Sequence, residues 1–227
     1  VLRSNYNPFI QNFMVIHILF LFTLLACISY LPDELKFLKK IYWLIGIVLI
    51  LTAGFRSADV TNDYENYLNA YNEISFESRL EPTFTLIALC VKFLFNSSIF
   101  LFFIYALLGV SIKFIAIKKL TNLFILSVLL YLSNFFLLHE MTQIRAGIAS
   151  GILLLCIKPL YDRNFKTFFF LVVIAVGFHY SSVIILPLWF LNPFSLKRKL
   201  YLSVLPLAYL LALKGFTIGL LVQQVPL

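Results

Sequence analysis

Long apolar runs, separated by short polar segments, are the main pattern along this chain. Several runs approach the roughly 20 residues that a helix needs to cross a bilayer. Backbone polar groups in lipid must be satisfied within their own segment, and the runs lack the alternation of barrel strands, so each is expected to be a helix. The predicted fold is all-α, a polytopic integral membrane protein with about 8 transmembrane helices. The candidate spans are residues 13–31, 41–55, 98–117, 123–138, 144–157, 167–178, 182–191 and 200–213.

The composition agrees with this pattern. Of the 227 residues, 62% are hydrophobic and 12% are charged, whereas a soluble domain carries about a quarter charged residues. The chain has too few polar side chains to cover a water-exposed body, so a soluble globular fold is excluded. The net charge of +8 comes from small basic clusters between apolar runs and not from a basic arm, so no nucleic-acid partner is expected.

The distribution of charge predicts the orientation in the membrane. By the positive-inside rule, four basic clusters belong in the cytoplasm. They are Lys36, Lys39 and Lys40; Lys118 and Lys119; Lys158, Arg163 and Lys166; and Lys197, Arg198 and Lys199. The segment 56–82 holds six of the ten acidic residues, so it is expected to form an external loop. Segments 139–145 and 177–182 fall on the same outer face.

The apolar segment 83–95 interrupts the alternation of sides. A full crossing there would move all later basic clusters outside, and 13 residues of helix reach only about 20 Å across a core of about 30 Å. We therefore expect a re-entrant or interfacial helix that leaves and returns on the outer side, within a single transmembrane domain of residues 1–227. The N-terminus is then outside.

Aromatic residues follow two patterns. In the external segment, Tyr64, Tyr67, Tyr71 and Ile74 share one face of a helix, which predicts an amphipathic helix on the membrane surface. Anchoring to the interface is the favoured role of this stripe, and stacking on sugar rings is the alternative. Other aromatic residues near span ends fit an interfacial belt: Tyr30, Tyr42, Trp43, Tyr131 and Trp189.

Charged groups beside hydrocarbon are costly, so those that gather on the outer face mark a candidate site. Arg56 follows the second span, with the carboxylates of Asp59 and Asp63 four residues apart behind it. An ordinary solvated loop start is the alternative. Glu81 precedes Pro82 at the start of the short outer helix, and helix capping alone also explains that pair.

The strongest group surrounds Arg145. His139 and Gln143 are four residues apart with Glu140 between them, and Arg145 opens an apolar run rich in small residues, which allow close helix approach. Free backbone N–H groups and a guanidinium at a helix start suit phosphate oxygens. A snorkelling arginine is the alternative.

His179 follows an apolar run and precedes Tyr180 and Ser181. It is either a proton-transfer group or a neutral histidine bonded to backbone. The sequence has no HExxH motif and no cysteine cluster, so neither a metal nor another cofactor is expected. The three cysteines, Cys27, Cys90 and Cys156, lie in apolar segments and are expected to pack there.

These motifs, in order, resemble the EpsG-type branch of the Wzy-like polysaccharide repeat-unit polymerases. The resemblance rests on Arg56-x-x-Asp59-x-x-x-Asp63-Tyr64-x-x-Tyr67, Glu81-Pro82, Gln143-Ile144-Arg145-x-Gly147 and Phe178-His179-Tyr180-Ser181. It implies a bacterial inner-membrane enzyme whose active face is periplasmic and which polymerises O-antigen, capsule or exopolysaccharide repeats carried on undecaprenyl diphosphate. The chain is shorter than usual for this family, so a truncated or alternatively started product is one expectation.

In the implied reaction, a growing glycan leaves its lipid diphosphate and joins a hydroxyl of the next lipid-linked repeat. Candidate proton acceptors are Asp59, Asp63, His139 and His179, in no order. Candidate groups that bind the diphosphate or the glycan are Arg56, Arg145, Glu81, Glu140, Gln143, Tyr64 and Tyr67. Expected partners are the undecaprenyl-diphosphate-linked oligosaccharide, membrane lipids and a chain-length regulator. The alternatives are a flippase for the same lipid-linked sugars and another membrane transferase, such as an O-antigen ligase.

Overall fold

Every regular element that the structure describes is a helix, which confirms the predicted all-α class. The computed structural model describes residues 8–31, 36–57, 63–76, 78, 80–191, 202, 203, 206 and 209. In chain order the elements are α1 (Pro8–Ile28), α2 (Lys36–Gly54), α3 (Asp63–Asn72), α4 (Pro82–Leu94), α5 (Ser98–Leu120), α6 (Phe124–Leu130), the π-helix η2 (Tyr131–Thr142), α7 (Ile144–Tyr161), α8 (Phe165–Phe178) and the 3₁₀-helix η3 (Tyr180–Phe190).

Four helical segments among the described residues are long and apolar enough to cross a membrane, so the protein is a multi-pass membrane protein. They are Phe37–Gly54, Ser98–Leu120, Phe124–Thr142 and Ile144–Tyr161. Shorter apolar helices cover Met14–Ile28, Pro82–Leu94, Phe165–Phe178 and Tyr180–Phe190. The predicted span 200–213 lies outside the described residues, apart from four isolated positions.

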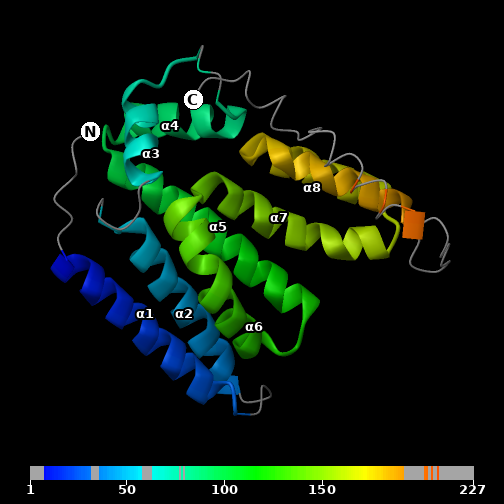
Figure 1. Ribbon diagram of the computed structural model, residues 1–227, viewed down its shortest axis with the longest axis horizontal. Helices are drawn as coiled ribbons and strands as arrows, with labels where there is room; N and C mark the ends of the chain where they lie inside the picture. Colours follow the sequence, from blue (N-terminus) through cyan, green and yellow to red (C-terminus); the bar gives the residue numbers. More distant parts are fainter. Residues whose placement is uncertain are drawn as a thin grey trace. The chain divides into compact units, whose positions relative to one another are not determined.

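The chain consists of two compact units, residues 1–186 and residues 187–227. Within the first unit, α5 packs against α2 on one side and α7 on another, and α7 also packs against α8 (Figure 1). The described part of the second unit consists of the end of η3, Leu191 and the four isolated residues. The polar groups discussed below belong to the first unit.

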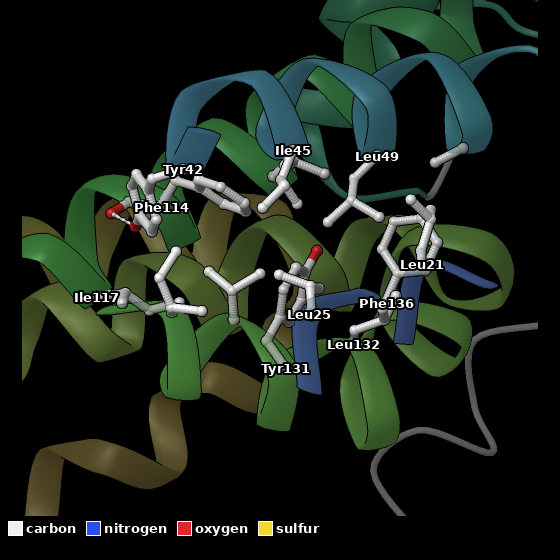
Figure 2. Packing of buried hydrophobic residues seen from close by; sticks show 14 of the residues in the cluster. Leu21, Leu25, Tyr42, Ile45, Leu49, Phe114, Ile117, Tyr131, Leu132 and Phe136 are labelled. Atoms are coloured by element: carbon white, nitrogen blue, oxygen red, sulfur yellow. Dashed lines mark hydrogen bonds between the residues drawn. The ribbon is translucent and has the colours of Figure 1, made fainter. Parts of the chain in front are cut away.

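The first hydrophobic core joins α1, α2, α5, α6 and η2 (Figure 2). Tyr42 is buried there and donates a hydrogen bond to the backbone oxygen of Phe114 at 2.6 Å. Tyr131 is also buried in this core. The interfacial belt predicted for these two tyrosines is therefore wrong, because both rings pack between helices; Tyr30, in contrast, is 91% exposed.

The second hydrophobic core joins α3, α4, α5, α7 and α8. Tyr67 and Tyr71 are buried in it on one face of α3, as predicted, and Ile74 is buried there too but lies beyond the end of the helix at Asn72. The favoured role as a membrane anchor is wrong for this face, because the rings pack on protein: Tyr64 stacks on Phe102 of α5 at 4.3 Å between ring centroids. α3 thus packs on the first turns of α5.

Candidate functional site

Two polar clusters lie among the apolar helices. The Glu81 cluster consists of Glu81, Arg145 and His179, with Tyr67 beside them. The Glu140 cluster consists of Lys113, Tyr131 and Glu140, together with the backbone oxygen of Gly147. Each cluster draws on at least three separate elements, so neither exists before the helices pack.

Glu81 precedes α4, and Pro82 at the first helical position fixes the direction in which the chain enters the helix. The Glu81 side chain makes no capping hydrogen bond. It instead forms an ion pair with Arg145, and its second oxygen lies 3.3 Å from Nδ1 of His179. Capping alone therefore does not explain this glutamate, because its carboxylate joins segments that are distant in sequence.

Arg145 lies at the start of α7 with its guanidinium between two rings. The guanidinium carbon is 5.4 Å from the centroid of Tyr67 and 5.6 Å from that of Phe84. This geometry permits cation–π attraction and holds the planar fork in one orientation. The Arg145 side chain keeps 23% of its surface exposed, so it is paired with Glu81 but not sealed from a ligand.

His179 follows α8 and is 38% exposed. Two contacts bind this turn to the beginning of α4: the Thr83 hydroxyl donates to the Gly177 oxygen at 2.7 Å, and the Tyr180 hydroxyl donates to the Leu80 oxygen at 3.4 Å. These contacts hold His179 beside Glu81.

Electrostatics keep the Glu81 carboxylate ionised. Burial raises the pKa of Glu81, but the hydrogen bond from His179 and the charge of Arg145 outweigh burial, and the net pKa lies below its usual value. Burial also raises the pKa of Tyr67, and the opposing charge of Arg145 does not cancel that effect. At neutral pH the cluster thus holds an ionised carboxylate, a guanidinium and a neutral phenol.

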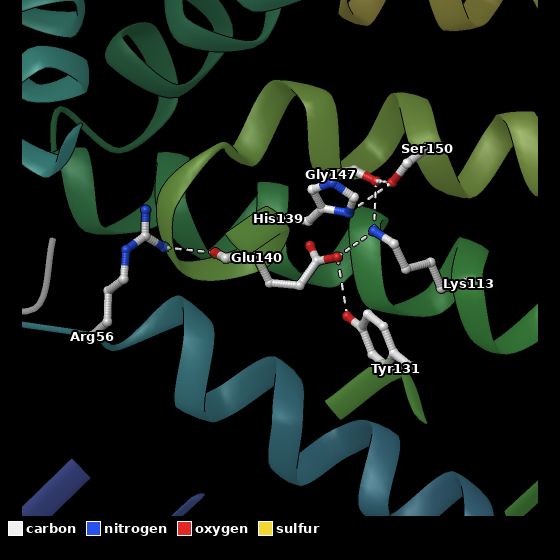
Figure 3. Close-up of polar contacts among 7 residues, drawn as sticks. All are labelled: Arg56, Lys113, Tyr131, His139, Glu140, Gly147 and Ser150. Carbon is white, nitrogen blue, oxygen red and sulfur yellow. Dashed lines mark hydrogen bonds and ion pairs between the residues drawn. The ribbon is translucent and has the colours of Figure 1, made fainter. Parts of the chain in front are cut away.

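The Glu140 cluster is the most deeply buried charge pair that the described residues contain (Figure 3). Lys113 and Glu140 are 3% and 1% exposed and form an ion pair. Lys113 Nζ also donates to the Gly147 oxygen at 2.6 Å, and the Tyr131 hydroxyl donates to the Glu140 carboxylate at 3.0 Å. Each charge therefore has the additional partners that a buried ion pair requires.

Glycines make this close approach possible. A Cβ on Gly109 would fall on the Glu140 carboxylate, and a Cβ on Gly147 would lie 2.7 Å from the His139 backbone oxygen. The small residues that the sequence showed after Arg145 thus serve helix contact, as expected.

Arg56 lies next to the Glu140 cluster, just after α2. One guanidinium nitrogen donates to the backbone oxygens of Ala53 and Glu140, at 2.9 and 3.3 Å. The guanidinium covers the ring of Phe102 at 4.4 Å. Burial lowers the pKa of Arg56 to about 10, so Arg56 remains charged at neutral pH. Its Nε and second terminal nitrogen are buried without a hydrogen-bond partner.

Aromatic rings connect the two clusters. Arg56 faces Phe102, Phe102 stacks on Tyr64 and meets Tyr67 edge-on at 6.5 Å, and Arg145 covers Tyr67. The two arginines singled out from the sequence therefore share one aromatic layer.

The remaining predicted residues lie at separate positions. His139 contacts Ser150 at 3.2 Å and stacks on Phe135, and it lies beside Gly147 at the edge of the Glu140 cluster (Figure 3). Asp63 begins α3, and Gln143 is the single residue between η2 and α7. Asp59 lies outside the described residues.

Sequence reasoning misses Lys113 and assigns Tyr131 to the interfacial belt. The signal for Lys113 is its place inside an otherwise apolar span, where a lysine is costly without a partner. Lys113 lies only five residues before Lys118, so it is easily counted with the basic residues that predict the topology. Over the part of the chain that the structure describes, no three His, Cys, Asp or Glu side chains are grouped to hold a metal ion.

These features define an all-helical, multi-pass membrane protein in which charged side chains from separate helices meet between apolar segments. Comparison with known proteins makes the assignment specific: residues 39–226 match the EpsG family, and the chain belongs to that family.

A curated relative is the amylovoran biosynthesis protein AmsC of Erwinia amylovora. It is 27% identical over 192 residues, which cover 77% of this chain and 51% of the relative. The chain thus spans about half the length of this relative. No solved structure matches the chain significantly.

Proposed function

We propose that this protein acts in the polymerisation of a polysaccharide, transferring a growing glycan from undecaprenyl diphosphate to the next lipid-linked repeat. Membership of the EpsG family and the likeness to a protein named for amylovoran biosynthesis support a role in polysaccharide biosynthesis. The proposed reaction rests on the Glu81 cluster, in which a partly exposed arginine is held beside a carboxylate–histidine pair.

Arg145 binds the lipid diphosphate in this proposal. Negative charge grows on the diphosphate as its bond to the anomeric carbon breaks, and a fixed guanidinium stabilises that charge. The fork at Arg145 suits two phosphate oxygens better than a lysine would. The diphosphate reaches the exposed part of the guanidinium, and Glu81 with Tyr67 and Phe84 holds the rest. No metal takes part in the proposed step.

His179 receives the proton of the incoming hydroxyl. When Nδ1 of His179 donates to the ionised Glu81, the other ring nitrogen is left as a proton acceptor. The hydroxyl oxygen then forms the new bond to the anomeric carbon while the diphosphate departs with the bonding electrons. Four proton acceptors are expected from the sequence. Among those that the structure describes, His179 is favoured because it alone contacts Glu81, the ion-pair partner of Arg145.

The other predicted residues surround the proposed reacting groups and have supporting roles. Tyr64 and Tyr67 form the aromatic layer between Arg56 and Arg145, and Asp63 and Gln143 lie at the ends of the helices beside it. Glu140 has no exposed surface for a substrate in this conformation. We further propose that the site opens to the outer leaflet of the bacterial inner membrane and that a chain-length regulator is a partner.

A glycan ladder from cells that lack and then regain the gene tests this function. The proposal predicts that the deletion leaves single repeats on the carrier or on lipid and that the restored gene returns the ladder. Lipid-linked repeats retained inside the cell would indicate a flippase instead. A polymer that forms but is not attached would indicate a ligase, and an unchanged ladder would refute all three.

A further inference from the structure

Lys113 is a charged residue that the reaction proposed above does not use. It lies 15 residues after Ser98 and seven before Leu120 in α5, which is about 22 Å and about 10 Å along the helix. Its side chain is 3% exposed, so its ammonium is buried between helices. A buried lysine is costly unless its partners are fixed, so its position calls for a specific role.

The partners of Lys113 lie on both sides of one helix junction. Its ammonium binds the Glu140 carboxylate near the end of η2 and the Gly147 oxygen in the first turns of α7 (Figure 3). Only Gln143 separates η2 from α7, and Arg145 lies two residues before Gly147. One ammonium thus ties α5 to the segment on each side of Arg145.

The same junction also receives Arg56, which donates to the Glu140 backbone oxygen. A shift of Glu140 would therefore move an acceptor of Arg56, and a shift of Gly147 would move the turn that carries Arg145. The Glu140 carboxylate also packs closely on two glycines: a Cβ on Gly109 would overlap it, and a Cβ on Gly147 would lie 3.2 Å from its Oε2.

We propose that Lys113 is a positioning residue, which sets the geometry of Arg145 by holding Glu140 and Gly147 together. This inference rests on the proposed role of Arg145 in transfer. Because displacement of a catalytic group by about 1 Å can cost about a hundredfold in rate, loss of Lys113 should lower polymer formation well beyond any fall in protein amount.

The test compares variants of the full chain in cells that lack the chromosomal gene, with polymer measured per amount of protein in the membrane. Lys113→Met removes the ammonium, and the double variant Lys113→Met/Glu140→Gln removes both charges, so no lone charge stays buried. Lys119→Met, at an exposed lysine of the same helix, is the matched control. The proposal predicts at least about a tenfold loss of polymer per protein in the double variant and none in the control.

A second comparison, of Lys113→Met with and without a change at Arg145, distinguishes a positioning role of Lys113 from a general effect on stability. If Lys113 acts through Arg145, then Lys113→Met lowers activity much less in an Arg145→Lys background than in the wild type. Equal losses in both backgrounds, or a double variant with normal polymer, would overturn the positioning role. So would a double variant that never reaches the membrane, since the pair would then serve folding alone. Full activity of Arg145→Lys and Arg145→Ala would refute the proposed function instead.

Discussion

Replacing Glu81 by alanine removes the carboxylate that joins α4 to the beginning of α7 and the end of α8. Breaking a fully buried pair costs about 3–5 kcal/mol, whereas an exposed pair contributes about 0–1 kcal/mol. Arg145 and His179 keep 23% and 38% of their surface exposed, so this site lies between the two limits. We expect a loss of about 2 kcal/mol, which corresponds to about 4–8 °C in melting temperature for a chain of this size.

Purified full-length protein in detergent or nanodiscs provides the assay, with melting followed by tryptophan fluorescence. Glu73→Ala is the matched control, because Glu73 is an exposed glutamate at the end of α3 and should change stability by less than about 0.5 kcal/mol. Glu81→Gln should lie between, since an amide keeps an oxygen acceptor but not the charge. Equal melting temperatures for Glu81→Ala and Glu73→Ala would refute the ion-pair role of Glu81.

Acid pH, a glycine of the Glu140 cluster and the membrane topology provide three further tests. The pKa of Glu81 is lowered in the folded protein, so its ion pair stabilises the protein fully above the ordinary pKa of 4.5, and this stabilisation is lost as the pH falls through the lowered pKa. The melting-temperature difference between wild type and Glu81→Gln should therefore shrink below about pH 4.5, and a constant difference would contradict this. Gly109→Ala should lower stability by about 1–3 kcal/mol in a thermal melt, since the added methyl falls on the buried Glu140 carboxylate. Gly177→Ala should lower it less, because its Cβ would meet only the Thr83 methyl group, at 3.2 Å. Cysteines placed at Ser75 and Lys119 should label from opposite sides of the membrane, and labelling of both from outside would overturn the re-entrant prediction for segment 83–95.

The helix positions could be predicted from the apolar runs, because the protein interior and the lipid-facing surface both require apolar side chains. The prediction for 98–117 and the observed α5 share their start, and 83–95 matches α4 within one residue at each end. Whether α4 is re-entrant stays a prediction. The π-helical form of η2 could not be predicted, because its continuous apolar run is equally compatible with an ordinary α-helix.

The candidate site was predictable only in part. The sequence predicts three site residues separately, each as a polar group beside an apolar segment: Glu81, Arg145 and His179. The structure brings them into contact. Their pairing depends on the packing of α4, α7 and α8, which no periodicity reports. The interfacial prediction for Tyr131 rests on the usual place of aromatic residues near span ends, but its hydroxyl donates to the buried carboxylate of Glu140 in the same π-helix.

In the proposed reaction, Arg145 stabilises the departing diphosphate. The glycan ladder made by Arg145→Ala and Arg145→Lys variants of the full chain, at equal membrane abundance, tests this role. We expect single lipid-linked repeats and no ladder with alanine, and a shortened or weakened ladder with lysine, which keeps the charge but loses the fork. A full ladder from the alanine variant would show that Arg145 does not have this role.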